Sequence, residues 1–211
     1  MPLVIAIDGP AASGKGTLAK RLATHHGLPH LDTGLLYRAV AVALIDAGGS
    51  LDDTAAAARE AARLDAARLD DPRLRGRATG EAASRVSAVP EVRTALLAWQ
   101  QRFASDPAGA VLDGRDIGTV VCPGASVKLF VTASPTERAR RRHLELTGRG
   151  DAATLESVLA DIEARDARDM ARAAAPLRMA EDAVRLDTTE LDAEAAFAWA
   201  NAIVERARSE S

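Results

Sequence analysis

Short apolar runs alternate along the chain with longer stretches of helical periodicity. The runs cover residues 3–9, 29–34, 109–116, 126–134 and 182–189, and most of them end in Asp, Gly or Thr. The first, LVIAIDG, is almost continuously apolar, which is typical of a strand buried on both faces. Strands that alternate with helices predict a parallel sheet joined by crossover helices. We therefore predict an α/β fold, a three-layer sandwich around a parallel sheet of about five strands.

The helical stretches carry recognisable start and stop signals. We expect helices over 13–27, 35–47, 52–71, 89–104, 134–146, 155–174 and 192–209. Gly27 is a good C-terminal stop. Ser134 is expected to cap its helix, with Pro135 at the first helical position and Glu137 completing a capping box. In 89–104, one face carries Val92, Leu96, Trp99 and Phe103.

Length and charge narrow the class of protein. The 211 residues suit a single domain, and we expect a monomer. A net charge of −3 and 3% aromatic residues do not favour a nucleic-acid or membrane partner. No signal peptide or membrane span is apparent. Cys122 is the sole cysteine, which suits a reducing cytoplasm.

The glycine-rich stretch GPAASGKGT, residues 9–17, joins the first strand to the first helix. It contains one of only three lysines in a chain whose other basic residues are arginines. Its spacing is that of a Walker A loop, whose backbone N–H groups and helix N-terminus bind polyphosphate. The structural alternative is a turn that binds nothing. We predict a P-loop NTPase fold in which ATP contacts Gly9, Pro10, Ala11, Ala12, Ser13, Gly14, Lys15, Gly16 and Thr17.

A P-loop by itself does not distinguish a kinase from a GTPase or a nonenzymatic ATP-binding switch. A GTPase needs an NKxD motif to read guanine, and the sequence has none. A switch is disfavoured by the number of arginines near the expected site, since one nucleotide does not need so many. Phosphoryl transfer between two nucleotides does need converging cations, because several phosphate charges come together.

Several motifs together resemble the bacterial cytidylate kinase family of P-loop nucleoside monophosphate kinases. They are GPAASGKGT, LDTGLLYRAVA, AASRVSAVPEVRTALL, LDGRDIGTVVCPGASVKLFVTAS and ARDARDMARAAAPL, and they extend over nearly the whole chain. The resemblance implies transfer of a phosphoryl group from Mg²⁺-bound ATP to CMP or dCMP. A P-loop kinase for another small acceptor is the alternative.

The resemblance also implies which residues bind the acceptor phosphate and ribose. On the predicted helix 155–174, Arg165, Asp169 and Arg172 are spaced i, i+4 and i+7 and share one face, although an exposed ladder of ion pairs would show the same spacing. By resemblance Arg115, Arg165 and Arg172 contact the phosphate, and Asp169 with Arg165 holds the ribose. Arg38 is a further candidate. The implied catalytic residues are Lys15, Arg115 and Arg172.

Cytosine offers an exocyclic amine beside two acceptors, so its pocket needs an acceptor next to a donor. By resemblance Asp116, Ser84 and Arg93 read the base, although a turn-capping Asp, a helix N-terminal Ser and a surface Arg are each common singly. Thr33 stands where the family often has serine. Tyr37 could stack on the nucleotide or belong to the core.

Three further predictions concern a residue that orients Mg²⁺, a lid and the monophosphate-binding insert. Asp113 ends a buried strand and is expected to orient Mg²⁺ through water rather than by direct ligation. Residues 138–155 resemble a mobile lid, in which Arg141 and Arg142 would contact ATP, unless they form a plain basic helix face.

The monophosphate-binding insert, about 35–105, looks shortened, because 64–84 has few β-branched residues where the family has a small sheet. We expect a helix and a loop there.

Overall fold

The computed structural model describes residues 2–209. The chain divides into two compact units, one formed by residues 1–31 and 103–211 and the other by residues 32–102. The first unit contains the sheet and the glycine-rich loop, and the second is helical.

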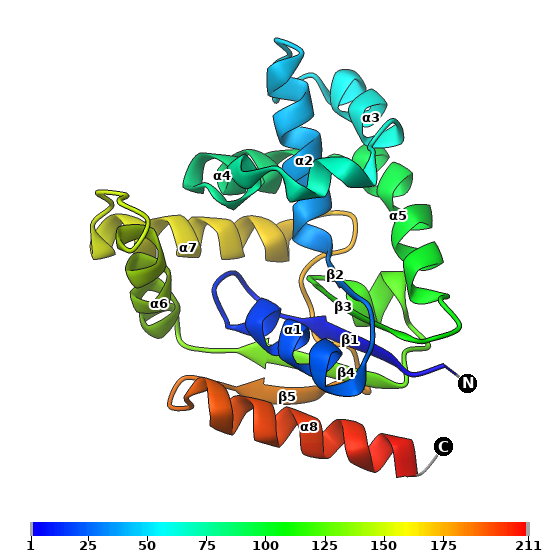
Figure 1. Ribbon diagram of the computed structural model, residues 1–211. Helices are drawn as coiled ribbons and strands as arrows, with labels where there is room; N and C mark the ends of the chain where they lie inside the picture. Colours follow the sequence, from blue (N-terminus) through cyan, green and yellow to red (C-terminus); the bar gives the residue numbers. More distant parts are fainter. Residues whose placement is uncertain (1, 210–211) are drawn as a thin grey trace. The chain divides into compact units, whose positions relative to one another are not determined.

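A five-stranded parallel sheet forms the centre of the first unit (Figure 1). Its strands are β1 (Val4–Asp8), β2 (His30–Asp32), β3 (Ala110–Gly114), β4 (Val127–Thr132) and β5 (Val184–Asp187). The order is β2-β3-β1-β4-β5, so β1 lies in the middle, with Val4 opposite Ala110 and Ile5 opposite Val127. The predicted fold class is confirmed. Because the strands are parallel, their carboxyl ends share one edge, where ligands of such sheets bind.

Four helices accompany the sheet: α1 (Lys15–His26), α6 (Pro135–Thr147), α7 (Leu155–Ala171) and α8 (Ala193–Ser209). Helices α1 and α8 pack on it through a core that includes Leu22, Ala200 and Val204, together with Ile5 and Leu129 of the strands. A short π-helical turn, Ile117–Val121, follows β3 and packs against β1. These contacts fix the loop between β1 and α1 at the carboxyl edge of the sheet.

Helices α6 and α7 form a hairpin with its own apolar cluster, which includes Ala139, Leu146, Val158 and Ile162. The Oγ of Ser134 accepts the Glu137 amide, as expected for an N-cap. The predicted capping box is wrong, however. The Ser134 amide donates to Thr189 Oγ1, and the Glu137 carboxylate is bound by Arg140 and Arg141 instead.

The second unit contains α2 (Thr33–Asp46), α3 (Thr54–Ala62), α4 (Arg77–Val86) and most of α5 (Pro90–Ala104), with 3₁₀ turns at Ala66–Asp70 and Pro72–Arg75. Between residues 33 and 102, all of which are described, there is no strand, in agreement with the expected helix and loop. The helix expected over 52–71 ends early, and α2 begins before Leu35 because Asp32 caps it. On α5, Val92 and Leu96 are buried, whereas Trp99 and Phe103 are half-buried.

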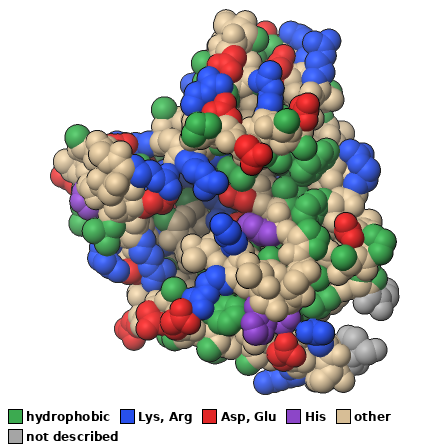
Figure 2. Space-filling model, in the orientation of Figure 1, with side chains coloured by type: hydrophobic (Ala, Val, Ile, Leu, Met, Phe, Trp, Pro, Cys, Tyr) green, Lys and Arg blue, Asp and Glu red, His purple; other side chains and the backbone are tan. Residues whose placement is uncertain are grey.

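Basic and acidic side chains are interspersed over the face drawn in Figure 2, which agrees with the small net charge. Among the described residues, no helix is both long enough and apolar enough to cross a membrane.

Candidate nucleotide-binding site

The glycine-rich loop has the backbone of an anion cradle. Gly9 has φ 155° and Gly14 has φ 86°, and a Cβ on Gly9 would collide with the Val131 carbonyl. Gly14 is also the N-cap residue of α1 and has no side chain to cap the helix. The N-terminus of a helix favours anions, because its first amides have no acceptor within the helix and the helix dipole is positive there.

Polar atoms of this loop face inwards. Ser13 is fully buried, and its Oγ has no hydrogen-bond partner among the described residues. The Nζ of Lys15 lies 3.3 Å from the Pro10 carbonyl oxygen, so the ammonium folds back over the loop. A buried hydroxyl without a partner is costly unless a ligand satisfies it. The loop therefore fits a phosphate group.

Asp113, at the carboxyl end of β3, faces the start of α1. Its Oδ2 lies 3.7 Å from the point where a Cβ would stand on Gly16, and its Oδ1 lies 2.8 Å from the Nε2 of His30. The carboxylate is therefore close to the loop and is oriented by a histidine from β2. Oxygen ligands that include one carboxylate suit Mg²⁺ held with a phosphate. Sequence reasoning did not single out His30.

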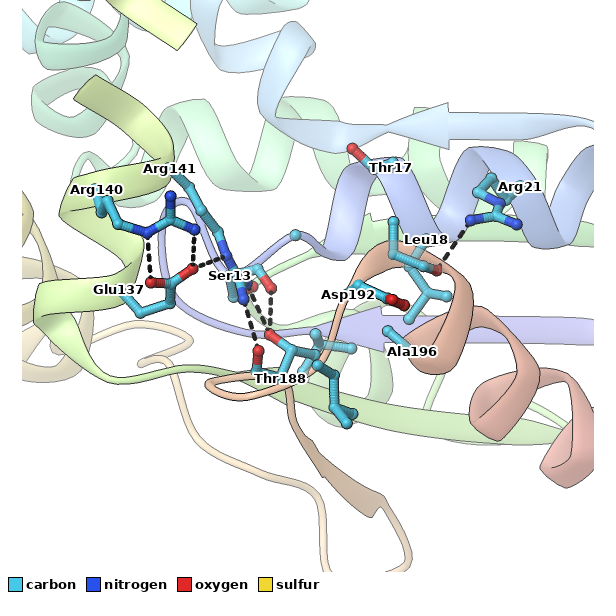
Figure 3. Close-up of a pocket in the computed structure, with 14 residues that line it drawn as sticks. Ser13, Thr17, Leu18, Arg21, Glu137, Arg140, Arg141, Thr188, Asp192 and Ala196 are labelled. Carbon is cyan, nitrogen blue, oxygen red and sulfur yellow. Dashed lines mark hydrogen bonds and ion pairs between the residues drawn. The ribbon is translucent and has the colours of Figure 1, made fainter. Parts of the chain in front are cut away.

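A cavity of about 290 Å³ opens beside the loop (Figure 3). Ser13, Thr17 and Leu18 line one side, and Thr188, Leu191 and Ala196 line another. Its lining combines apolar and polar groups, as nucleobase pockets do. Thr188 was not predicted, although its position just after β5 at the carboxyl edge is a signal that could have identified it.

Arg141 of α6 lies in this cavity and is held firmly. Its guanidinium donates to Thr188 Oγ1 at 2.9 Å, to the Thr188 carbonyl at 2.6 Å and to Glu137 at 2.8 Å. Hydrogen bonds from Arg140 and Arg141 lower the pKa of Glu137 to about 2. Figure 3 shows these side chains gathered beside Ser13. Arg142, also expected to contact ATP, pairs with Glu145 at 2.7 Å.

Three arginines surround the buried carboxylate of Asp169 on α7. Arg115 Nε lies 2.8 Å from Asp169 Oδ2, Arg172 Nη2 lies 3.5 Å from Oδ1, and Arg165 Nε lies 4.0 Å from Oδ2. Burial alone would raise the pKa of Asp169, but the charges of the arginines outweigh it and the pKa is lowered. The predicted shared face of α7 is thus present, with Arg115 joining it from the segment after β3.

Arg138, a buried residue that sequence reasoning missed, links the glycine-rich loop to α7. It donates to the carbonyls of Ala133 (2.9 Å) and Ala11 (3.1 Å), and its Nη2 lies 2.6 Å from Asp166 Oδ2. Its side chain is 4% exposed. The remaining Asp166 oxygen is buried with no hydrogen-bond partner among the described residues. A lone arginine in a basic stretch gives no sequence signal of burial.

Five predicted acceptor-site residues lie in the helical unit. Thr33 and Ser84 are buried. Tyr37 is 8% exposed, and the Arg93 guanidinium lies 5.5 Å from the centre of its ring. The Arg38 guanidinium donates to the carbonyls of Leu74 and Gly76, so it holds the second 3₁₀ turn. Within this unit the structure thus brings Tyr37 and Arg93 together.

A possible metal-binding group lies elsewhere in the first unit. His25, His26 and Glu205 place ligand atoms within 4.8 Å of one another, although their sequence spacing gave no such signal. The Arg208 guanidinium already lies 3.3 Å from His26 Nδ1 and 3.6 Å from Glu205. Cys122 is buried, and burial raises its pKa to about 11, so its thiol is unreactive at neutral pH.

The loop, the sheet order and the arginine cluster define a P-loop nucleotide kinase. A family profile described as cytidylate kinase matches residues 5–206. Named cytidylate kinases are similar over nearly their whole length: one from Methylobacterium sp. (strain 4-46) is 71% identical over 96% of this chain and 97% of its own, and one from Xanthobacter autotrophicus is 64% identical over 98% and 99%. The chain belongs to the cytidylate kinase family.

A solved structure from Eubacterium ventriosum, described as an uncharacterized protein, covers 99% of both chains with a TM-score of 0.56. At 14% sequence identity, this likeness concerns the fold alone.

Proposed function

We propose that this protein transfers the γ-phosphoryl group of ATP to CMP or dCMP, giving ADP and CDP or dCDP. The observation that carries the proposal is a complete phosphate cradle in the same unit as a buried carboxylate that gathers three arginines, in a chain of the cytidylate kinase family. The glycine-rich loop can bind the polyphosphate of one substrate, and the arginine cluster can bind the phosphate of a second one.

The donor is assigned to the loop and the adjoining cavity. The amides of residues 9–17 hold the phosphates, and Lys15 moves from Pro10 onto the transferred group as a compact charge. Thr188 and Leu191, which line the cavity, are proposed to flank the base, and Arg141 is proposed to contact the phosphates. Mg²⁺, which this kinase family uses with ATP, would be oriented through water by Asp113, with Thr17 near the metal-bound phosphates, and would neutralise charge on the phosphates. When ATP binds, a phosphate oxygen would give the buried Ser13 hydroxyl the hydrogen-bond partner that it lacks.

The acceptor residues are assigned by resemblance to the family. Arg115, Arg165 and Arg172 take its phosphate, Asp169 with Arg165 takes its ribose, and Arg38 is a further phosphate ligand. The base is read by Asp116, Ser84 and Arg93, with Thr33 bonding the nucleotide and Tyr37 lying beside it. Binding exchanges arginine–Asp169 contacts for arginine–phosphate contacts, which are of comparable strength.

Direct in-line transfer requires positioning and charge stabilisation rather than covalent catalysis. Lys15 with the loop amides stabilises the leaving oxygens, and Arg115 and Arg172 stabilise the moving phosphoryl group. No group of the protein needs to form a bond to phosphorus. Residues 138–155, which comprise most of α6 and the connection to α7, are proposed to close over the donor, with Arg142 exchanging Glu145 for phosphate. The protein is proposed to act as a cytoplasmic monomer.

An assay of ADP release with Mg-ATP tests this function, with CMP, dCMP, UMP, AMP, GMP and no acceptor measured in parallel. We expect turnover with CMP and dCMP and much weaker turnover with the others. A preference for another monophosphate would assign a different acceptor. ATP binding without turnover on any acceptor would instead indicate a switch, and either result would overturn the proposal.

A further inference from the structure

Asp8, the last residue of β1, makes an unusual pair of hydrogen bonds. Its Oδ1 accepts the amide of Ile117 and its Oδ2 accepts the amide of Gly118, both at 2.7 Å. Asp8 is 4% exposed, and Gly9, the first residue of the nucleotide-binding loop, follows it directly. The carboxylate therefore joins the strand that carries the donor loop to the segment after β3.

These two amides are the first of the turn Ile117–Val121, where no intrahelical acceptor exists for them. The residue at the N-cap position is Asp116, and an aspartate there would ordinarily accept them. Asp116 makes no side-chain capping bond to the turn. Asp8, at the end of β1, accepts these two amides in place of Asp116.

The fit at this point is close. A Cβ on Gly118 would stand 3.4 Å from Asp8 Oδ2 and 3.2 Å from Lys128 Cδ, so glycine lets the carboxylate approach. Only a carboxylate can accept both amides. An asparagine has one oxygen, and its NH₂ group would face the second N–H.

We propose that Asp8 is a positioning residue for recognition of the acceptor base: by capping the turn in place of Asp116, it holds Arg115 and Asp116 in position, so that the Asp116 side chain does not cap the turn and keeps the place from which it would read the exocyclic amine of a cytosine nucleotide. The inference rests on the role proposed above for Asp116. Without Asp8, Asp116 is the nearest replacement cap, and its rotation towards the turn would remove the base contact.

The ionisation of Asp8 supports this reasoning. Burial raises its pKa to about 6, against the two backbone hydrogen bonds, which lower it. The charged and titratable groups around it are Asp116, Arg115, Cys122 and Lys128. A protonated carboxyl keeps only one oxygen as a good acceptor, so one amide of the turn loses its bond at low pH.

The test compares kcat/KM for CMP with kcat/KM for UMP in the wild type, Asp8→Asn and Asp8→Ala at pH 7.5. We expect the CMP-to-UMP ratio to fall about tenfold in both variants, a change comparable to loss of one base contact, with KM for ATP nearly unchanged. Asp106→Asn is the matched control. Asp106 also accepts a backbone amide, from Ala108 at 2.8 Å, but lies in an exposed turn before β3.

The wild type alone supplies a second test, which applies even if the variants do not fold. Its CMP-to-UMP ratio should decline between pH 7.5 and 5.5, whereas the ratio in Asp8→Asn should stay low and flat. Titration of the acceptor phosphate near pH 6 is common to both substrates and cancels in the ratio.

The outcomes separate the two proposals. If the wild type shows no preference for CMP, the proposed function fails whatever Asp8 does. If the wild type prefers CMP and the ratio is the same in Asp8→Asn, or is independent of pH in the wild type, the positioning role of Asp8 is wrong and the proposed function stands.

Discussion

The Nε2 atom of His30 lies 2.8 Å from the Oδ1 atom of Asp113, across the neighbouring strands β2 and β3. This contact fixes the carboxylate, whose other oxygen faces the start of α1 at Gly16. Groups that orient a metal-binding residue act on metal affinity although they do not touch the metal.

We therefore expect replacement of His30 to change the Mg²⁺ requirement of the enzyme. In His30→Leu we expect the Mg²⁺ concentration for half-maximal turnover to rise by roughly 10-fold or more, because Asp113 loses its orienting partner. His30→Gln keeps a hydrogen-bond donor on the side chain. Its Mg²⁺ concentration for half-maximal turnover should therefore lie between the values for the wild type and His30→Leu. Turnover against free Mg²⁺ at fixed ATP measures this, and identical Mg²⁺ curves for all three proteins would contradict it.

Lys15 is expected to act on the chemical step. Lys15→Met should remain folded and lose kcat by on the order of 10³, because the charge on the transferred group is no longer neutralised. Lys20→Met removes an exposed lysine of the same helix and serves as control. Circular dichroism checks the fold, and steady-state kinetics supplies kcat. Unchanged turnover in Lys15→Met would remove this residue from the mechanism.

Asp116 is expected to set the choice of base. Asp116→Ala should narrow the preference for CMP over UMP by roughly 1–3 kcal/mol, the worth of one base-reading contact. The ratio of kcat/KM values measures this directly. An equal loss on both substrates would indicate a structural role instead.

Arg138 is expected to matter for stability. Arg138→Met leaves Asp166 buried without its cation and should lower the free energy of unfolding by about 3–5 kcal/mol. The double variant Arg138→Met, Asp166→Leu should recover much of this loss, because it removes both charges together. Urea denaturation measures both values, with Arg140→Met as an exposed control. A double variant no more stable than the single one would mean that the Ala133 and Ala11 contacts dominate.

The raised pKa of Asp8 predicts a pH-dependent stability. Its folded pKa of about 6 exceeds the unfolded value of 3.8, so its contribution is fully present below pH 3.8 and is lost as pH rises through 6. Between pH 3.8 and pH 6 the free energy of unfolding of the wild type should therefore fall by up to roughly 3 kcal/mol relative to that of Asp8→Asn. This is about two pH units at ~1.4 kcal/mol each. Unfolding by urea from pH 4 to 7.5 measures the difference. Curves that stay parallel across the window would refute it.

The sequence predicted the strands and the loop well, because a parallel sheet imposes continuous apolar runs and the loop has a fixed glycine spacing. Lys15, Ser13 and Asp113 follow from position along the chain. The helix over 52–71 was overestimated, since alanine-rich periodicity does not say where burial ends, and only Ala57 and Ala61 of α3 are buried.

The residues that sequence reasoning missed act through partners far away in the chain. Asp8 bonds to residues about a hundred positions later, and Arg138 bonds to Ala11 and Asp166. Buried arginine and exposed arginine look alike in a chain with so many of them. The roles of Asp8 and Arg138 can be inferred only from a structure that shows β1, α6 and α7 packed within one unit.

The pairing of β1 also constrains how the protein folds during synthesis. The partners of β1 are β3 and β4, and Val4 meets Ala110 about a hundred residues later in the chain. The helical unit 32–102, built from local contacts, emerges from the ribosome before either partner strand exists, and such units fold quickly. The apolar strand β1, which precedes the glycine-rich loop, therefore stays unpaired until the helical unit and then β3 have been synthesised.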